Sequence, residues 1–164
     1  MTNPNWTVRP ERYDSPDATA LRVDYYYDVA ARYYNRPITA EEIDDGILNE
    51  GLDRLAPPTG RFVVGRANGE PAACGGVVLL DAGRAELTRV FVRHAFRGTG
   101  GAALLMDALE EAATKLGARR VVLNTRLDLV EARALYTRHG YREIPAYREG
   151  PYMEVWYGKE LPTR

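Results

Sequence analysis

The part of this 164-residue sequence best suited to chemistry is a glycine-rich segment behind an arginine, Arg97-Gly98-Thr99-Gly100-Gly101. A β-rich stretch, Ala85–Arg93, precedes it, and the apolar residues after it follow helical spacing up to Gly117. The first N–H groups of a helix lack internal partners and carry partial positive charge, so they bind phosphate oxygens. Glycines admit an anion close to the backbone. The segment predicts a phosphate site, and a tight strand-to-helix turn is the alternative.

Two well-known phosphate loops fit this segment poorly. A P-loop carries Lys after its last glycine, and no Lys follows here. A dinucleotide-binding fingerprint follows an early strand and precedes a second βα unit, whereas about half of this chain comes before the glycines. The predicted phosphate site therefore belongs to neither class.

Two motifs in register indicate another class. Arg97-x-x-Gly100-x-Ala102 matches the R/Q-x-x-G-x-G/A loop of the GNAT N-acetyltransferase superfamily, and a later segment resembles its following signature, Ala132-x-x-Leu135-Tyr136-x-x-x-Gly140-Tyr141. The resemblance is clear over residues 60–161 and looser before them. It implies an α+β (α/β) fold: a single GNAT-type domain whose mixed, mainly antiparallel sheet has a central splayed parallel strand pair flanked by helices.

The resemblance also implies acetyl-CoA as cosubstrate. Its pantetheine arm would bind exposed backbone of the strand at 85–93, and a backbone N–H of Val92 or Phe91 would stabilise the oxyanion. Family members often carry Asn where this chain has Leu129, and whether Asn124 substitutes for it stays open. The predicted cosubstrate-binding residues are Phe91, Val92, Arg97, Gly98, Thr99, Gly100, Gly101, Ala102 and Asn124.

Acetyl transfer from a thioester to an amine needs a deprotonated amine and a proton for the departing thiolate. Glu86, the first acid of the central strand, is the predicted base, directly or through water; a rim glutamate paired with Arg89 or Arg126 is the alternative. Tyr136 is the predicted acid, because a phenol can donate a proton to sulfur. A packed aromatic side chain is the alternative for Tyr136.

Turn signals and apolar periodicity predict the strands and helices that must position these residues. Asn68-Gly69 predicts a hairpin between strands at 61–67 and 71–80. The strand at 85–93 and a strand at 120–125 enclose the helix after the glycines, so this βαβ unit predicts parallel pairing. A helix at 129–139 and strands at 141–144 and 152–161 complete the chain.

The N-terminal residues predict a short strand at 6–9 and two helices. Ser15-Pro16 begins the first helix, which runs to about Tyr34 with a core-facing stripe of Val23, Tyr27, Ala30 and Tyr34. A capping box, Thr39 with Glu42, opens a second helix to about Leu55, with Asp44 and Asp45 in its first turns.

Five tyrosines of the first helix cannot all face the core. With Asp24 or Asp28, the surplus tyrosines predict an acceptor pocket suited to a cationic amine. Core packing together with a helix–helix or homodimer contact is the alternative. Asp24, Asp28 and Arg32 have the i, i+4 spacing of an ion-pair ladder.

The composition of the chain argues against several other classes of protein. The net charge of −1 and the lack of a basic run argue against nucleic-acid binding. Cys74, the sole cysteine, lies among small apolar residues and is expected to be buried. No metal site is expected. A start without signal-peptide character and the lack of a long apolar run favour a cytoplasmic protein without membrane attachment.

The sequence thus predicts one acetyltransferase domain over 1–164, with a variable acceptor side (1–60) and an acetyl-CoA-binding core (61–161). The predicted activity is acetyl transfer from acetyl-CoA to a primary amine of a small molecule or peptide. A non-catalytic acyl-CoA-binding sensor or partner module is the alternative, and a nucleotide-binding α/β protein is a third hypothesis.

Overall fold

The structure is a computed structural model that describes residues 2–43 and 48–163. Its strands form one seven-stranded sheet in the order β1-β2-β3-β4-β5-β7-β6. Neighbouring strands are antiparallel except for the parallel pair β4–β5. The strands are β1 (Trp6–Pro10), β2 (Gly60–Ala67), β3 (Glu70–Leu79), β4 (Arg84–Val92), β5 (Arg120–Thr125), β6 (Arg142–Glu143) and β7 (Val155–Glu160).

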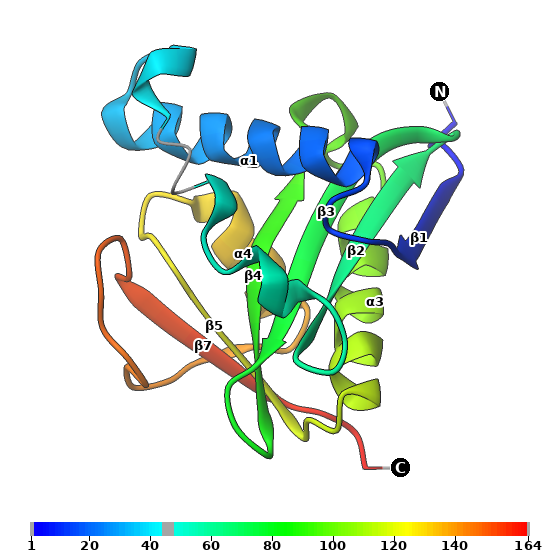
Figure 1. Cartoon of the computed structure of the whole chain (residues 1–164), viewed down its shortest axis with the longest axis vertical. Helices are drawn as coiled ribbons and strands as arrows, with labels where there is room; N and C mark the ends of the chain where they lie inside the picture. The colour runs from blue at the N-terminus through cyan, green and yellow to red at the C-terminus, as the bar shows by residue number, and fades with distance from the viewer. Residues whose placement is uncertain (1, 44–47, 164) are drawn as a thin grey trace.

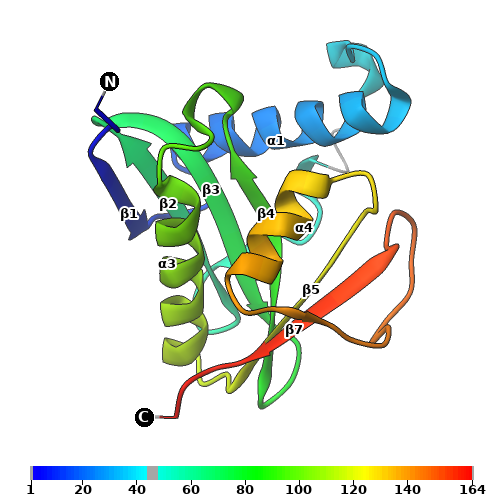
Figure 2. The same ribbon diagram turned by 180° about the vertical axis from the view of Figure 1, so that it is seen from behind.

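Helices cover both faces of the sheet. Helix α1 (Pro16–Tyr34) crosses one face, whereas α3 (Gly101–Lys115) and α4 (Val130–Arg138) cover the other, as Figures 1 and 2 show. A large apolar core lies between the sheet and α3 and α4, and a smaller one lies beneath α1. Within 2–43 and 48–163, no helix has the length and apolar character needed to cross a membrane.

Local signals fix several of these elements. Asn68 and Gly69 adopt left-handed backbone angles (φ 49° and 83°), which is the geometry of the predicted two-residue hairpin turn. The Ser15 hydroxyl accepts a hydrogen bond from the Ala18 N–H at 3.1 Å and caps α1. Gly117, at φ 95°, ends α3. These three predictions are confirmed.

The parallel pair β4–β5 opens after a short zone of pairing. Arg84, Ala85 and Glu86 pair with Arg120, Val121 and Val122, and both strands continue beyond this zone without pairing to each other. Figures 1 and 2 show β4 and β5 diverging toward α1. The predicted splayed pair is confirmed, and Glu86 lies at its fork.

The predicted core stripe of α1 is wrong. Val23, Tyr27 and Ala30 are half-buried, and Tyr34 is 54% exposed. The face toward the sheet instead runs through Ala18, Leu21, Tyr25, Asp28, Val29 and Arg32; its first residues enter the small core, and its last ones line a cavity. Apolar periodicity misses this face because its cavity half carries charges.

The predicted second helix is not continuous over its described residues, of which 48–49 are α-helical. The capping box forms, with the Thr39 N–H donating to Glu42 Oε1 at 3.2 Å, but it opens a 3₁₀-helix of three residues, Ala40–Glu42. Ile43 is extended (φ −93°, ψ 115°) and ends that turn. A further 3₁₀-helix, Leu52–Leu55, follows Gly51 in a left-handed conformation. Asp44 and Asp45 lie outside the described residues.

Candidate active site

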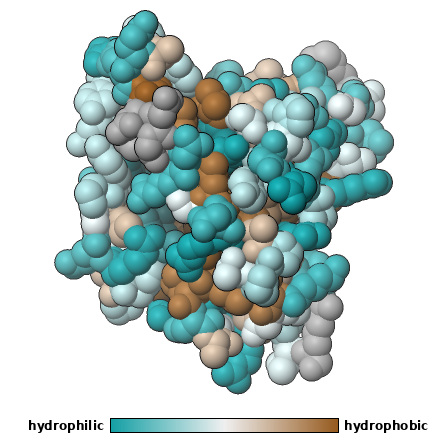
Figure 3. All heavy atoms as spheres, in the orientation of Figure 1, coloured by the Kyte–Doolittle hydropathy of each residue, from teal (hydrophilic) through white to brown (hydrophobic). Residues whose placement is uncertain are grey.

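A cavity of about 740 Å³ opens where β4 and β5 diverge. Figure 3 shows apolar surface in the middle of the α1 face, surrounded by hydrophilic side chains. The cavity walls come from α1, β4, the glycine loop, α3, β5, α4 and the loop before β7. The residues that matter for its chemistry are Asp28, Arg32, Glu86, Thr88, Arg89, Arg97, Gly98, Gly100, Asn124, Glu131, Tyr136 and Arg148.

The glycine loop presents open backbone to this cavity. Gly98 and Gly100 have φ of 74° and 97°, and a Cβ added to either would meet nothing within 4 Å. The backbone N–H groups of 98–101 donate no hydrogen bond to any residue that the structure describes. A phosphate bound here would supply acceptors to these amides at the N-terminus of α3. The loop therefore has the open amides that an anion at this helix end requires.

Gly101 and Thr99 serve the fold in a way that the sequence did not reveal. A Cβ on Gly101 would lie 2.2 Å from the Trp6 ring, so this glycine is needed for close packing of β1 on α3. Trp6 Nε1 donates to the Thr99 hydroxyl at 3.0 Å, and that hydroxyl donates to Phe96 O at 2.6 Å. Packing alone thus requires glycine at position 101, and an anion at its amide stays a prediction.

Arg97 connects the loop to the open strand. Its Nε donates to Val92 O at 3.0 Å, and its Nη2 lies 3.5 Å from Asp28 Oδ2 on α1. Val90, Phe91 and Val92 line the cavity along the part of β4 that does not pair with β5. The Phe91 side chain turns away to pack against Tyr25, so this strand offers its backbone to the cavity.

Tyr136 lies in the cavity wall on α4. It is 5% exposed, and its ring packs against Tyr141 and Tyr157 at centroid distances of 6.1 and 6.0 Å. Burial raises the pKa of the Tyr136 phenol above its ordinary value. Among the described residues, none forms a hydrogen bond with its hydroxyl, which leaves that group available to a ligand.

Glu86 lies at the fork of the splayed strands and is 8% exposed. Arg148 Nη2 donates to both of its oxygens at 2.8 and 2.9 Å, the Tyr147 hydroxyl donates to Oε2, and Asn124 Nδ2 lies 3.3 Å from Oε2. The expected ion-pair partners, Arg89 and Arg126, are wrong, and Arg148 takes their place. Asn124 is directed at this cluster.

Electrostatics keep the two donors protonated. Hydrogen bonding to Glu86 raises the pKa of Arg148. Burial and, next, the hydrogen bond to Glu86 raise the pKa of the Tyr147 phenol. Glu86 therefore accepts hydrogen bonds from three side chains, and its role as the base stays a prediction.

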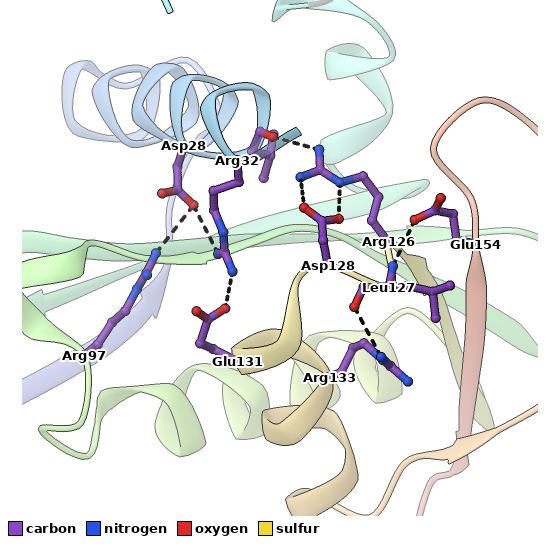
Figure 4. A network of polar contacts seen from close by, with 10 residues as sticks. Asp28, Arg32, Arg97, Arg126, Leu127, Asp128, Glu131, Arg133 and Glu154 are labelled. Carbon is purple, nitrogen blue, oxygen red and sulfur yellow. Dashed lines mark hydrogen bonds and ion pairs between the residues drawn. The ribbon is translucent and has the colours of Figure 1, made fainter. Parts of the chain in front are cut away.

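A chain of ion pairs joins the two sides of the opening (Figure 4). Asp28 lies between Arg97 and Arg32, at 3.5 and 3.7 Å, and Arg32 also pairs with Glu131 on α4. The hydrogen bond from Arg32 lowers the pKa of Glu131. Helix α1 is thereby tied to both the glycine loop and α4. Only the Asp28–Arg32 step of the predicted ladder is present.

A second group in Figure 4 anchors the residues between β5 and α4. Arg126, 6% exposed, donates to Asp128 at 2.8 Å and to Val29 O at 2.7 Å, and its hydrogen bond lowers the pKa of Asp128. Leu129, where the family often has Asn, precedes α4 and lines the cavity with an apolar side chain.

Cys74 and His139 are not specified by the two sequence motifs, and their contacts indicate structural roles. Cys74 is fully buried, as predicted, and burial raises the pKa of its thiol to about 12. His139 Nε2 lies 3.0 Å from Asp107 and 3.6 Å from Glu110, so carboxylates as well as the helix end surround it. Over the described ranges, no group of three or more His, Cys, Asp or Glu side chains is arranged to hold a metal ion.

The splayed β4–β5 pair, with an open glycine loop between the end of β4 and the start of α3, is the arrangement that the family resemblance implied. The sequence profile of the acetyltransferase (GNAT) family matches residues 21–141, and the chain belongs to this family.

Individual relatives agree with this assignment. The chain is 30% identical to the IAA acetyltransferase of Azospirillum brasilense over 102 residues, which are 62% of this chain and 65% of that protein. A GNAT-family acetyltransferase from Staphylococcus aureus Mu50 superposes with a TM-score of 0.76 at 16% identity over 96% of this chain and all of the other. One from Elizabethkingia anophelis, solved with acetyl-CoA bound, superposes with a TM-score of 0.68 at 16% identity over 96% and 99% of the two chains.

Proposed function

We propose that this protein transfers the acetyl group of acetyl-CoA to a primary amine of a small molecule or peptide. The observation that carries the proposal is one cavity at the opening between β4 and β5 that contains the glycine loop and Tyr136, whose loop amides and hydroxyl have no hydrogen-bond partner among the described residues. The open loop amides suit an anionic cosubstrate, and the hydroxyl suits proton donation to its leaving group.

Acetyl-CoA supplies an activated acetyl group as a thioester. The amides of Gly98–Gly101 and the cation of Arg97 would hold its pyrophosphate, next to Ala102 in the first turn of α3. A backbone N–H of Val92 or Phe91, in the part of β4 that does not pair with β5, would donate to the oxygen that becomes negative during transfer. In this role Arg97 exchanges part of its contact with Asp28 for phosphate.

Two side chains would move the protons. The amine loses a proton, its nitrogen forms a bond to the acetyl carbon, and the carbon–sulfur bond breaks with the electron pair going to sulfur. Tyr136 donates a proton to that thiolate. Because Tyr147 already donates to Glu86, the amine proton reaches Glu86 through the Tyr147 oxygen, whose own proton passes to the carboxylate.

One observation favours a second function. Glu86 is held by Arg148, Tyr147 and Asn124, so a carboxylate at this position can equally serve to fix the loop before β7. A chain with that arrangement and no proton path would bind acyl-CoA without turnover, as a sensor or partner module.

Thiol release separates the two functions. Purified protein is incubated with acetyl-CoA and a panel of primary amines, and free thiol and acetylated product are measured together with the Kd of CoA. The proposal expects amine-dependent thiol release with one acetylated product per thiol. CoA binding without release on any amine would favour the module, and a lack of CoA binding would contradict both functions.

A further inference from the structure

Arg89 lies in the wall of the cavity at an irregular point of β4. Between the pairs Cys74–Phe91 and Gly76–Thr88, β4 contains one residue more than β3, which is a β-bulge. Arg89 has φ of 56°, a left-handed conformation that is uncommon for a residue other than glycine. A bulge changes the direction in which nearby side chains point, and this one determines where Arg89 points.

The bulge turns two consecutive side chains to the same face. Leu87 and Val90 pack in the large core under α3, whereas Arg89 reaches α1, where its Nε donates to the Tyr26 hydroxyl at 3.1 Å. Its Nη1 donates to the neighbouring Thr88 hydroxyl at 3.0 Å. The α1 face of β4 therefore presents Glu86, Thr88 and Arg89 in series to the cavity.

Arg89 has no counter-ion among the described residues. Its three nitrogens donate to neutral oxygens: the two hydroxyls above and Glu50 O at 2.6 Å. By contrast, Arg32 and Arg148 on the same side of the cavity pair with Asp28 and Glu86. A half-buried guanidinium in a cavity wall without a carboxylate is costly unless a ligand supplies the negative charge.

A second cation makes the site more positive. Arg22, 5% exposed, donates to Tyr13 O, Leu48 O and the Thr19 hydroxyl, and no carboxylate in the described chain pairs with it. Burial lowers its pKa, and the positive charge of Arg89 lowers it further. Arg22 and Arg89 are thus neighbouring cations, and neither forms an ion pair with a carboxylate of the described residues.

We infer that Arg89 binds a carboxylate of the acceptor, so that the acceptor is an amino acid or another amine that carries a carboxylate. The inference rests on the proposed acetyl transfer. A guanidinium has five N–H groups, and Arg89 uses three, which leaves one on each terminal nitrogen for a two-point contact with a carboxylate. Since a strand rises about 3.3 Å per residue, Arg89 and Glu86 are separated by about 10 Å of strand. A small zwitterion fits between them, with its amine toward the Tyr147–Glu86 pair.

The test compares each amino acid of a panel with its own primary amide, which keeps the amine and removes the negative charge. For the wild type, kcat/KM for thiol release should favour the acid by about 30-fold or more. Arg89→Gln should remove this preference through KM for the acid and leave the amide unchanged, and Arg89→Lys should restore part of it. Arg54→Gln is the matched control, because Arg54 donates to Leu79 O outside the cavity.

A binding measurement keeps the inference testable without turnover. Calorimetry with CoA present should show tighter binding of an N-acetyl amino acid than of its amide to the wild type, with the difference lost in Arg89→Gln. Equal binding and equal kcat/KM for acids and amides on the wild type would overturn the inference. So would an acid preference that survives in Arg89→Gln while Tm and the Kd of CoA stay unchanged. Failure of every amine to release thiol would contradict the proposed function instead, and the calorimetric comparison would still decide the role of Arg89.

Discussion

The two halves of the cavity are built from different parts of the peptide chain. The half that we propose for the cosubstrate consists mainly of backbone: the amides of the glycine loop and the part of β4 that pairs with β3 but not with β5. The acceptor half consists of side chains from segments far apart in sequence, such as Glu86 on β4 and Arg148 in the loop before β7. Backbone can hold a ligand common to many family members, whereas side chains can change with the acceptor.

This difference predicts how each half responds to mutation. A change in the cosubstrate half acts through backbone conformation and blocks binding of CoA whatever the acceptor is. A change in the acceptor half alters proton transfer, loop anchoring or acceptor choice and leaves CoA binding in place. The following experiments test that division, beginning with the largest expected effect.

Gly100→Asp should weaken CoA binding on the order of 1,000-fold. At φ 97° a side chain is strained, and the new carboxylate would lie at the open amides, where it repels phosphate. Gly69→Asp is the matched control, because Gly69 also has positive φ (83°) and open space but lies in the β2–β3 hairpin. The Kd of CoA is measured by calorimetry, and equal affinities for the two variants would contradict the phosphate assignment.

Tyr136→Phe should lower kcat by about 100-fold and change the Kd of CoA by less than about threefold. Since the described residues give the hydroxyl no hydrogen bond, its removal leaves no buried group unpaired, and Tm should stay the same. Tyr157→Phe serves as control: it changes a neighbouring buried tyrosine whose hydroxyl accepts from Arg133 at 3.1 Å. An unchanged kcat in Tyr136→Phe would remove Tyr136 from the acid role.

Arg148→Gln should lower the free energy of unfolding by about 1–3 kcal/mol, because it leaves Glu86 buried without its counter-ion. The Glu86→Gln/Arg148→Gln double variant should regain part of that loss. Arg12→Gln is the control: its partner is Asp14 at 2.9 Å, and its side chain is 76% exposed, so the loss should be small. Urea unfolding measures these proteins together with the wild type and the Glu86→Gln single variant, and strictly additive losses would show that Glu86 and Arg148 are not coupled.

The pH dependence of kcat should lack a falling alkaline limb below about pH 10. Burial raises the pKa of Tyr136, so its protonated, donating form persists above the ordinary phenol value of about 10. The rate should rise with pH as the amine loses its proton, with no fall due to Tyr136 in this range. A fall centred near neutral pH in the wild type, absent in Tyr136→Phe, would contradict a buried phenol as the acid.

The sequence predicted the fold around the glycine loop well because its signals are local. Asn68-Gly69 specifies a turn by backbone angle, and the glycine loop directly follows its strand. The βαβ unit required a parallel pair, and the family resemblance supplied its splay. Tyr136 lies in the cavity, and its role stays a prediction.

The acceptor half could not be predicted because its contacts are long-range. Nothing near Arg148 indicates that it meets Glu86, and nothing near Gly101 indicates that the Trp6 ring packs on it. On α1, Asp28 and Arg32 occupy the inward face, where apolar residues are expected. The apolar periodicity therefore predicted the wrong face of this helix to be buried. The signal for Arg89 lies in a bulge and a missing counter-ion, both visible only in three dimensions.

The division of the cavity can be measured directly by amide NMR of the 15N-labelled protein during separate titrations with CoA and with an N-acetyl amino acid. CoA should shift the amide resonances of Gly98–Gly101 and of Val92 most strongly, and the N-acetyl amino acid, added to the CoA complex, should shift those of Arg89, Tyr147 and Arg148. If the largest CoA shifts fall on α1 and on the loop before β7 while the glycine-loop amides stay unchanged, the assignment of the two halves is contradicted.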